Sequence, residues 1–265
     1  MYNSFQLTKK FLHYYFTASN GKGHGIHSPF VFDLITNVLK DKKQYDCYDK
    51  IEARRKILLQ DSQVIPVQDF GAGSAVIKTN KRKVSDIAAS SLKPKKFAQL
   101  LFRMVNYYPP QTILELGTSF GITTAYLASG NAAAKVFTCE GADTIANIAQ
   151  QNFNKLGLKN IDLITGDFAR TLPQVLTRLN TVDLAFIDGN HQKEPTLDYF
   201  RQLARCSTSS TVLIFDDIHW SKEMEAAWNE IKQAAGVTLT VDLFFIGIVF
   251  FNANIKIPQH FTIRF

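Results

Sequence analysis

From Thr112 onward, apolar runs typical of buried strands alternate with runs typical of amphipathic helices. Strands are predicted at 112–116, 135–139, 161–165, 182–187 and 211–215, and helices at about 121–129, 142–156, 169–179, 194–205 and 221–235. Strands joined through helices pair in parallel, and their right-handed crossovers cover both faces of the sheet. The alternation therefore predicts a doubly wound α/β fold.

The end of the chain departs from this alternation. Residues 237–243 and 245–251 are both strand-like, with almost nothing between them. So short a link permits only an antiparallel pair. We therefore expect a Rossmann-like sheet of seven strands whose last two form an antiparallel hairpin. Residues 260–265 are expected to add one more strand or a docking segment.

The first 92 residues lack this alternation of strand-like and helical runs and are mostly helical and basic in pattern. Helices are predicted at 4–18, 28–39, 48–59 and 84–91, and residues 1–100 hold 17 Lys and Arg against 8 Asp and Glu. We predict a basic, mainly helical extension over residues 1–92 and a second domain over residues 93–265. A lid, a dimer surface and a substrate-docking surface are all compatible with the extension.

Two glycine-rich segments could serve as a cofactor loop, residues 69–74 and residues 115–121. Such a loop must leave a buried strand and open a helix whose first amides face the ligand. Only the second segment has that context, and a second strand after it ends in Glu140, whose carboxylate can accept both hydroxyls of a ribose. We therefore select residues 115–121 and interpret residues 69–74 as a structural turn.

Other features exclude several classes of protein. Neither glycine-rich segment matches G-x-x-x-x-G-K-[ST], which argues against a nucleoside triphosphatase. A nicotinamide-dependent dehydrogenase is a distant competitor, because it normally has fuller G-x-G-x-x-G spacing. The longest apolar run is too short to cross a membrane, and three scattered cysteines are typical of reduced thiols. We expect a cytoplasmic protein with no membrane partner.

Five motifs carry a resemblance to a known family. They are ELGTSFGITT (115–124), TCEG (138–141), TGDF (165–168), AFIDGNHQ (185–192) and IFDDIHW (214–220). From about residue 94 to 251 the chain resembles class I S-adenosylmethionine-dependent methyltransferases. Within them it is similar to the metal-dependent O-methyltransferases of the catechol and caffeoyl-CoA type and to their relatives in sugar and macrolide biosynthesis.

The resemblance implies a binding site for S-adenosylmethionine. The loop would surround the methionine and ribose portions, Glu140 would bind the ribose, Asp167 would accept from the adenine amine, and Phe168 would flank the adenine ring. The residues that it assigns to the cofactor are Glu115, Gly117, Thr118, Ser119, Phe120, Gly121, Glu140, Gly141, Asp167, Phe168 and Asp188.

Three carboxylates are expected at the carboxyl ends of the fourth and fifth predicted strands, namely those of Asp188, Asp216 and Asp217. Carboxylates that converge on one crevice repel one another unless a cation neutralises them, and Mg²⁺ prefers oxygen ligands. The resemblance implies that Mg²⁺ or another divalent metal would bind there and activate a hydroxyl group. Many relatives have Asp-Asn where this chain has Asp216-Asp217, so one of the two could instead be structural.

His191 follows Asp188 by three residues. The catechol-type relatives carry a lysine at this place and the macrolide relatives a histidine, which takes the hydroxyl proton. An imidazole suits general-base work near neutral pH. We therefore predict His191 and Asp188 as the catalytic residues, with an exposed loop histidine as the alternative.

The favoured function is methyl transfer from S-adenosylmethionine to a hydroxyl oxygen of a small molecule, assisted by a divalent metal. One alternative is an RNA or protein methyltransferase that docks its substrate on the basic N-terminal region. Another is a non-catalytic binding module that keeps the fold. A small molecule is therefore the favoured partner, nucleic acid is a less favoured one, and a homodimer through the basic arm is compatible with the sequence.

Overall fold

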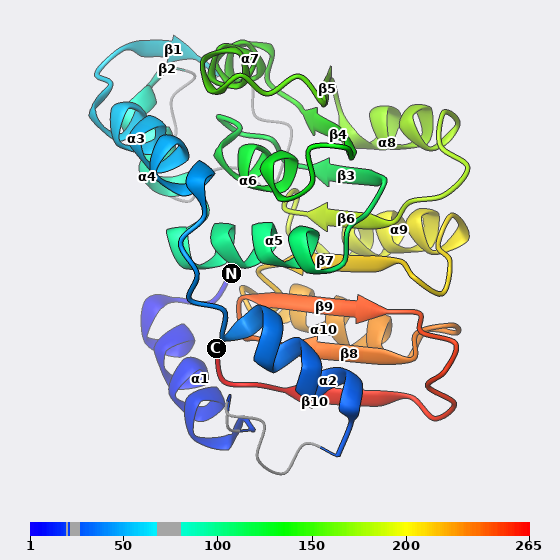
Figure 1. Cartoon of the computed structure of the whole chain (residues 1–265). Coiled ribbons are helices and arrows are strands. Elements are labelled where there is room, and N and C mark those ends of the chain that lie inside the picture. The colour runs from blue at the N-terminus through cyan, green and yellow to red at the C-terminus, as the bar shows by residue number, and fades with distance from the viewer. Residues whose placement is uncertain (20, 22–26, 68–80) are drawn as a thin grey trace. The chain divides into compact units, whose positions relative to one another are not determined.

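The computed structural model describes residues 1–19, 21, 27–67 and 81–265 (Figure 1). The chain forms two compact units. The first unit contains Met1–Asp41 and Leu179–Phe265, and the second contains Lys42–Arg178. The predicted extension over residues 1–92 is thus divided between the two units, while the boundary at residues 92 and 93 stays a prediction.

The second unit contains three parallel strands in the order β3-β4-β5. Their bounds are Thr112–Leu116, Lys135–Glu140 and Ile161–Thr165. In-register pairing aligns Leu116 with Cys139 and Glu140 with Thr165, so all three strands end at the same edge. This edge is where a βαβ fold presents its loops to ligands.

Helices α6, α7 and α8 of the second unit follow these strands, in agreement with the predicted alternation. Their bounds are Ile122–Gly130, Asp143–Leu156 and Phe168–Leu176. Ahead of the strands lie α3 (Asp46–Gln60), α4 (Val84–Ser91) and α5 (Lys95–Tyr107), with a small antiparallel pair of β1 (Val64–Pro66) and β2 (Lys81–Lys83). The sequence analysis missed β2, because three consecutive basic residues have low strand propensity.

The first unit contains five strands in the order β6-β7-β9-β8-β10. Their bounds are β6 Leu184–Ile187, β7 Val212–Asp216, β8 Leu239–Asp242, β9 Ile246–Phe250 and β10 Gln259–Thr262. Strands β6 and β7 are parallel, and β9 is antiparallel to both β7 and β8. The predicted hairpin is therefore confirmed, and the tail adds β10 in parallel to β8.

Helices of the first unit come from both ends of the chain. They are α1 (Ser4–Thr17), α2 (Pro29–Leu34), the π-helical turn η1 (Ile35–Leu39), α9 (Lys193–Arg205) and α10 (Lys222–Lys232). Helix α1 packs Tyr14 and Ala18 against Phe244, beside the β8–β9 turn. The helix predicted at 28–39 begins as expected at the Ser28 cap but changes to π-helical geometry at Ile35.

Candidate functional site

The segment between β3 and α6 is the predicted cofactor loop. The amides of Gly117 and Thr118 donate to the carbonyl of Cys139 at 3.0 and 3.2 Å, which fixes the loop to the end of β4. Gly117 and Gly121 have φ of 104° and 77°, a region that glycine adopts without a steric penalty. A side chain at Gly121 would also collide with the Phe153 ring. Both glycines are therefore required by the backbone of the loop.

Glu140, at the end of β4, connects the loop to the next turn. Its Oε2 accepts from the Ser119 amide at 2.8 Å, and its Oε1 accepts from the Ala142 amide at 3.0 Å. Each carboxylate oxygen has two acceptor sites, so an oxygen that holds one amide can also accept from a second donor. The side chain is partly exposed at the strand edge. This geometry is compatible with the predicted ribose contact.

Glu115 lies inside the fold. Its side chain is fully buried, and Oε2 accepts from the hydroxyls of Thr124 at 2.5 Å and Thr138 at 2.6 Å. The Thr118 hydroxyl lies 2.5 Å from that of Thr138 and extends the network into the loop. Glu115 therefore stabilises the loop from the buried side, through Thr138 and Thr118.

Asp188, also predicted to contact the cofactor, belongs to the first unit, and the remaining predicted residues follow strands of the second unit. Asp167 is exposed and caps α8, with Oδ1 accepting from the Ala169 amide at 3.0 Å. One carboxylate oxygen is thus committed to the cap. Phe168 and Gly141 are partly exposed, whereas the Phe120 side chain is buried in the core and offers only its backbone to a ligand.

Three supporting residues escaped the sequence analysis. The Ser91 hydroxyl lies 2.8 Å from that of Ser119, so the end of α4 contacts the loop. Asn152 is fully buried and donates to the Phe120 carbonyl at 2.8 Å while it accepts from Arg54 at 2.5 Å. These contacts join residues that are distant in sequence, so no local sequence pattern predicts them.

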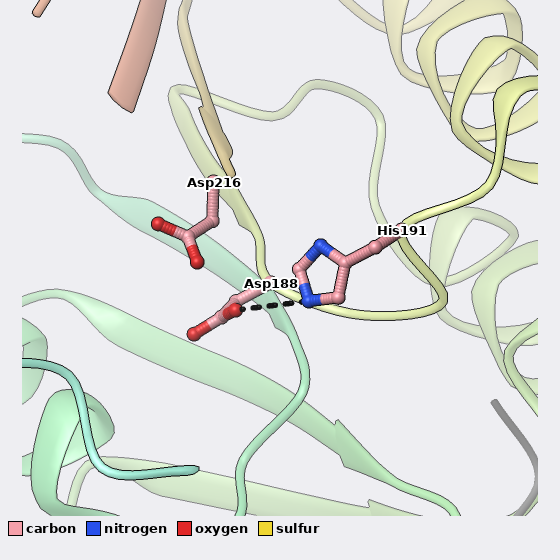
Figure 2. A group of neighbouring side chains, drawn as sticks. All are labelled: Asp188, His191 and Asp216. Carbon is pink, nitrogen blue, oxygen red and sulfur yellow. Dashed lines mark ion pairs between the residues drawn. The ribbon is translucent and has the colours of Figure 1, made fainter. Parts of the chain in front are cut away.

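A second group of side chains lies in the first unit, where β6 and β7 end. Register pairs Ile187 with Phe215, so Asp188 and Asp216 emerge from neighbouring strands. Figure 2 shows both carboxylates and His191 directed toward one another. One ligand atom from each of the three lies within 4.8 Å of the others, and His191 Nε2 is 3.6 Å from Asp188 Oδ1.

This group differs from the predicted metal set of Asp188, Asp216 and Asp217. Among the described residues, the atoms close enough to share an ion come from Asp188, His191 and Asp216. Asp217 has φ of 54°, and its carbonyl accepts from the Trp220 amide, so its backbone forms the turn after β7. The structure thus brings together two of the three predicted ligands and adds His191.

The backbone that presents His191 is also unusual. Asn190 and His191 have φ of 68° and 38°, which non-glycine residues adopt rarely and often at functional sites. The Asn190 amide donates to the Tyr199 hydroxyl of α9 at 3.2 Å. The positive φ angles of Asn190 and His191 therefore direct the imidazole toward Asp188, and the bond between Asn190 and Tyr199 stabilises this backbone conformation.

His219, three residues after Asp216, lies between two carboxylates. Its Nδ1 is 3.0 Å from Glu225 and its Nε2 is 2.8 Å from Asp242, so the imidazole donates from both nitrogens when it is charged. Burial lowers the pKa of His219, but the bonds with Asp242 and Glu225 outweigh it and raise the pKa above its ordinary value. The two carboxylates therefore favour the charged form of His219.

The comparisons with known proteins agree with this geometry. Residues 114–218 match the family model described as "Methyltransferase domain", a span that contains the glycine loop, Glu140, Asp167 and the Asp188 group. Over residues 114–218 the chain is thus similar to a methyltransferase domain. The predicted resemblance is thereby confirmed.

Solved structures share the fold of this methyltransferase domain. An O-methyltransferase from Bacillus cereus in complex with SAH is 20% identical, with a TM-score of 0.56 over 83% of this chain and 97% of that one. An O-methyltransferase from Streptomyces achromogenes, in complex with SAM, is 16% identical, with a TM-score of 0.55 over 84% and 95%. At these identities the likeness concerns the fold, and it confirms the predicted α/β methyltransferase architecture.

Curated relatives match parts of the chain. A catechol O-methyltransferase from Niastella koreensis is 30% identical over 145 residues, which are 53% of this chain and 63% of that protein. A tRNA (guanine-N(7)-)-methyltransferase from Mycoplasma mobile is 38% identical over 77 residues, 29% of this chain and 38% of that one. The chain thus spans less than two thirds of these relatives, whose names give different methyl acceptors.

Within the described part of the chain, helices long and apolar enough to cross a membrane are absent.

Proposed function

We propose that this protein transfers the methyl group of S-adenosylmethionine to a hydroxyl oxygen of a small molecule, with a divalent metal at Asp188 and Asp216. The observation that carries the proposal is that the one span matching a methyltransferase domain, residues 114–218, contains both the Glu140-anchored glycine loop and the residues of the Asp188–His191–Asp216 group. The partial match to a catechol O-methyltransferase supports an oxygen acceptor.

The cofactor residues act by position. The Gly117–Gly121 loop lets the backbone approach the methionine portion closely, and Glu140 accepts the ribose hydroxyls while it holds the Ser119 amide. Asp167 and Phe168 receive the adenine. When bound, S-adenosylmethionine supplies an electrophilic methyl group on its sulfonium. The protein then needs to align the acceptor oxygen with that methyl group and assist loss of the hydroxyl proton.

The Asp188 group suits a divalent cation. Two carboxylates supply hard oxygen donors, and the imidazole nearby is compatible with Mn²⁺ or Zn²⁺ as well as with Mg²⁺ on the carboxylates alone. A bound divalent metal supplies Lewis-acid activation of the acceptor hydroxyl. Asp188 and Asp216 would hold it, and Asp217, which the sequence also predicts as a ligand, would support the turn that carries Asp216.

His191 is proposed as the general base. The imidazole is partly exposed, so it can receive a proton from an acceptor and release it to water. Asp188 lies near enough to orient the ring and to stabilise the imidazolium that forms. The fixed backbone of Asn190 and His191 reduces the rotational freedom of the base.

A second candidate is methylation of RNA or protein, because the relatives include a tRNA methyltransferase and residues 1–100 are basic. A cytoplasmic location stays part of the proposal. The non-catalytic binding module is the third candidate, and the Glu140 and Asp167 carboxylates at the strand ends, with Glu115 buried beneath the loop, favour a retained cofactor site over it.

Titration calorimetry with S-adenosylhomocysteine tests the proposal first, with and without Mg²⁺ or Mn²⁺, beside a Glu140→Ala variant. We expect micromolar binding that the variant weakens at least tenfold, since it loses charge-assisted bonds worth about 1.5–3 kcal/mol. Methyl transfer to catechol-like hydroxyls is then compared with transfer to RNA. Absence of cofactor binding in every condition would overturn the proposal, and salt-sensitive transfer to RNA would replace its acceptor.

A further inference from the structure

Helix α1 carries two apolar stripes. One contains Leu7, Phe11, Tyr14 and Ala18, and it packs against Phe244 and Phe245 of the β8–β9 turn. The other lies on the exposed side and contains Phe5, Thr8, Leu12 and Tyr15, with Phe16 beside it and the exposed Met1 ahead of the helix. From Phe5 to Tyr15 the residues of the second stripe follow at intervals of three, four and three, the spacing of a helix that pairs with another helix.

The outer stripe exposes a large apolar area. Phe5 and Phe16 are 79% and 75% exposed and Tyr15 is 44% exposed, which leaves about 400 Å² of ring surface in water if each ring offers about 200 Å². Of the eleven large hydrophobic side chains exposed among the described residues, five lie within residues 1–16. A patch of this size on one helix is typical of an interaction site.

The helix that presents the stripe is firmly attached to its own unit. The Tyr2 hydroxyl donates to Glu225 at 2.6 Å, and Lys10 Nζ donates to the same carboxylate at 2.9 Å. The Tyr14 hydroxyl donates to the Ile263 carbonyl at 2.5 Å and accepts from the Phe265 amide at 3.0 Å. The outer stripe is therefore a preformed surface, so that docking on it costs little conformational entropy.

We infer that this surface binds a second copy of the chain, with α1 packed antiparallel against α1 of the partner about a two-fold axis near residue 10. Such a pair places Phe5 against Tyr15 and Phe16 of the other helix and the small Thr8 opposite Leu12. Two sets of rings bury about 800 Å², and Met1 and Leu12 bring the total to the lower range of specific interfaces, about 1,200 Å².

The spacing of the stripe favours a helix over a lipid surface as its occupant. A heptad stripe interlocks with a second stripe, whereas a bilayer has no such requirement. Charge provides a further distinction. Residues 1–32 contain no Asp or Glu, and Lys9 borders the stripe, so two copies bring like charges near each other. Salt therefore strengthens the self-association, while it would weaken binding to an anionic membrane.

Sedimentation equilibrium of the full chain tests the inference. We expect a dimer at micromolar concentration. Its affinity should rise when the NaCl concentration is raised from about 50 to about 500 mM, because the shorter Debye length screens the repulsion between the two basic helices. The Phe5→Glu, Phe16→Glu double variant should be monomeric. Ile257→Glu, at a side chain 76% exposed outside the helix, should remain dimeric. Unchanged thermal unfolding and S-adenosylhomocysteine binding would show that the double variant is folded.

Cysteine cross-linking tests the antiparallel order. A mixture of the Thr8→Cys and Leu12→Cys variants should form an intermolecular disulfide, whereas Thr8→Cys alone should form much less of it. The wild-type chain is the control for disulfides formed by the natural cysteines. A monomeric wild type overturns the inference, as does a double variant that stays dimeric. Flotation of a monomer with phosphatidylserine vesicles would replace the second copy by a lipid surface. Each of these outcomes can be read whether or not the wild-type chain binds the cofactor, so failure of the proposed function would not decide this test.

Discussion

Thr138 is directly opposite Glu115 in the β3–β4 pair, and its hydroxyl donates to Glu115 Oε2 at 2.6 Å. Because that proton is committed, the Thr118 hydroxyl must donate to Thr138 in turn. A buried carboxylate on β3 thus fixes the cofactor loop through two hydroxyl groups. The free energy of this network depends on Thr138, because among the described contacts it is the residue that bonds with both Glu115 and Thr118.

Thr138→Val should therefore weaken both the fold and the cofactor site. The change leaves buried polar groups with fewer partners at nearly constant volume, and we expect a loss of about 1–3 kcal/mol in the free energy of unfolding. Affinity for S-adenosylhomocysteine should fall as well. Urea denaturation and calorimetry measure the two effects. Thr138→Ser keeps the hydroxyl and should retain most of both, so equal losses in the two variants would contradict the network.

Gly121→Ala should destabilise the loop for two separable reasons. A positive φ costs a non-glycine residue about 1–2 kcal/mol, and the added methyl group would press on the Phe153 ring for about 1–3 kcal/mol more. Gly157→Ala is the matched control, because its φ is 71° but nothing lies within 4 Å of its added carbon. Thermal unfolding should show the larger loss at Gly121, and comparable losses would exclude the steric effect.

Asp188→Asn and Asp216→Asn should lower affinity for Mn²⁺ at least tenfold, since each variant removes an anionic ligand from the Asp188–His191–Asp216 group. Calorimetry or the electron paramagnetic resonance of Mn²⁺ measures this without turnover. Asp198→Asn, an exposed position on α9, controls for loss of charge. Asp217→Asn should have a smaller effect than Asp216→Asn.

His191→Ala separates the role of a base from that of a ligand. As a base, its loss should reduce kcat by about 10²–10⁴ and leave Mn²⁺ affinity nearly unchanged. A tenfold or larger loss of Mn²⁺ affinity would instead identify the imidazole as a metal ligand, and the base would have to be sought elsewhere.

Protein stability should decrease as pH rises above about 6.5, the ordinary pKa of histidine. The folded state raises the pKa of His219 through Asp242 and Glu225, so its contribution is complete below 6.5 and is lost as pH passes the folded value. Burial raises the pKa of Glu225, but the hydrogen bonds from Tyr2, Lys10 and His219 outweigh burial and lower that pKa, so the contribution of Glu225 is lost in acid. His219→Gln should remove the alkaline decrease, whereas exposed His13→Gln should leave it.

Much of the fold follows from local sequence. The alternation from Thr112, the short link before β9 and the Ser28-Pro29 cap each specify an element through patterns a few residues long, and the structure confirms those elements. The choice of residues 115–121 as the cofactor loop used the same local information. Residues 69–74, the rejected alternative, lie outside the described residues.

Other features depend on contacts between residues that are far apart in the chain. The sequence by itself determined the order of strands and helices and the presence of acidic residues at strand ends, because periodicity and turn chemistry act locally. Only the tertiary structure decided that Met1–Asp41 joins Leu179–Phe265, that His191 joins Asp188 and Asp216, and that His219 lies between Glu225 and Asp242. Packing and charge pairing select these neighbours in space, and that selection leaves no periodic trace along the chain.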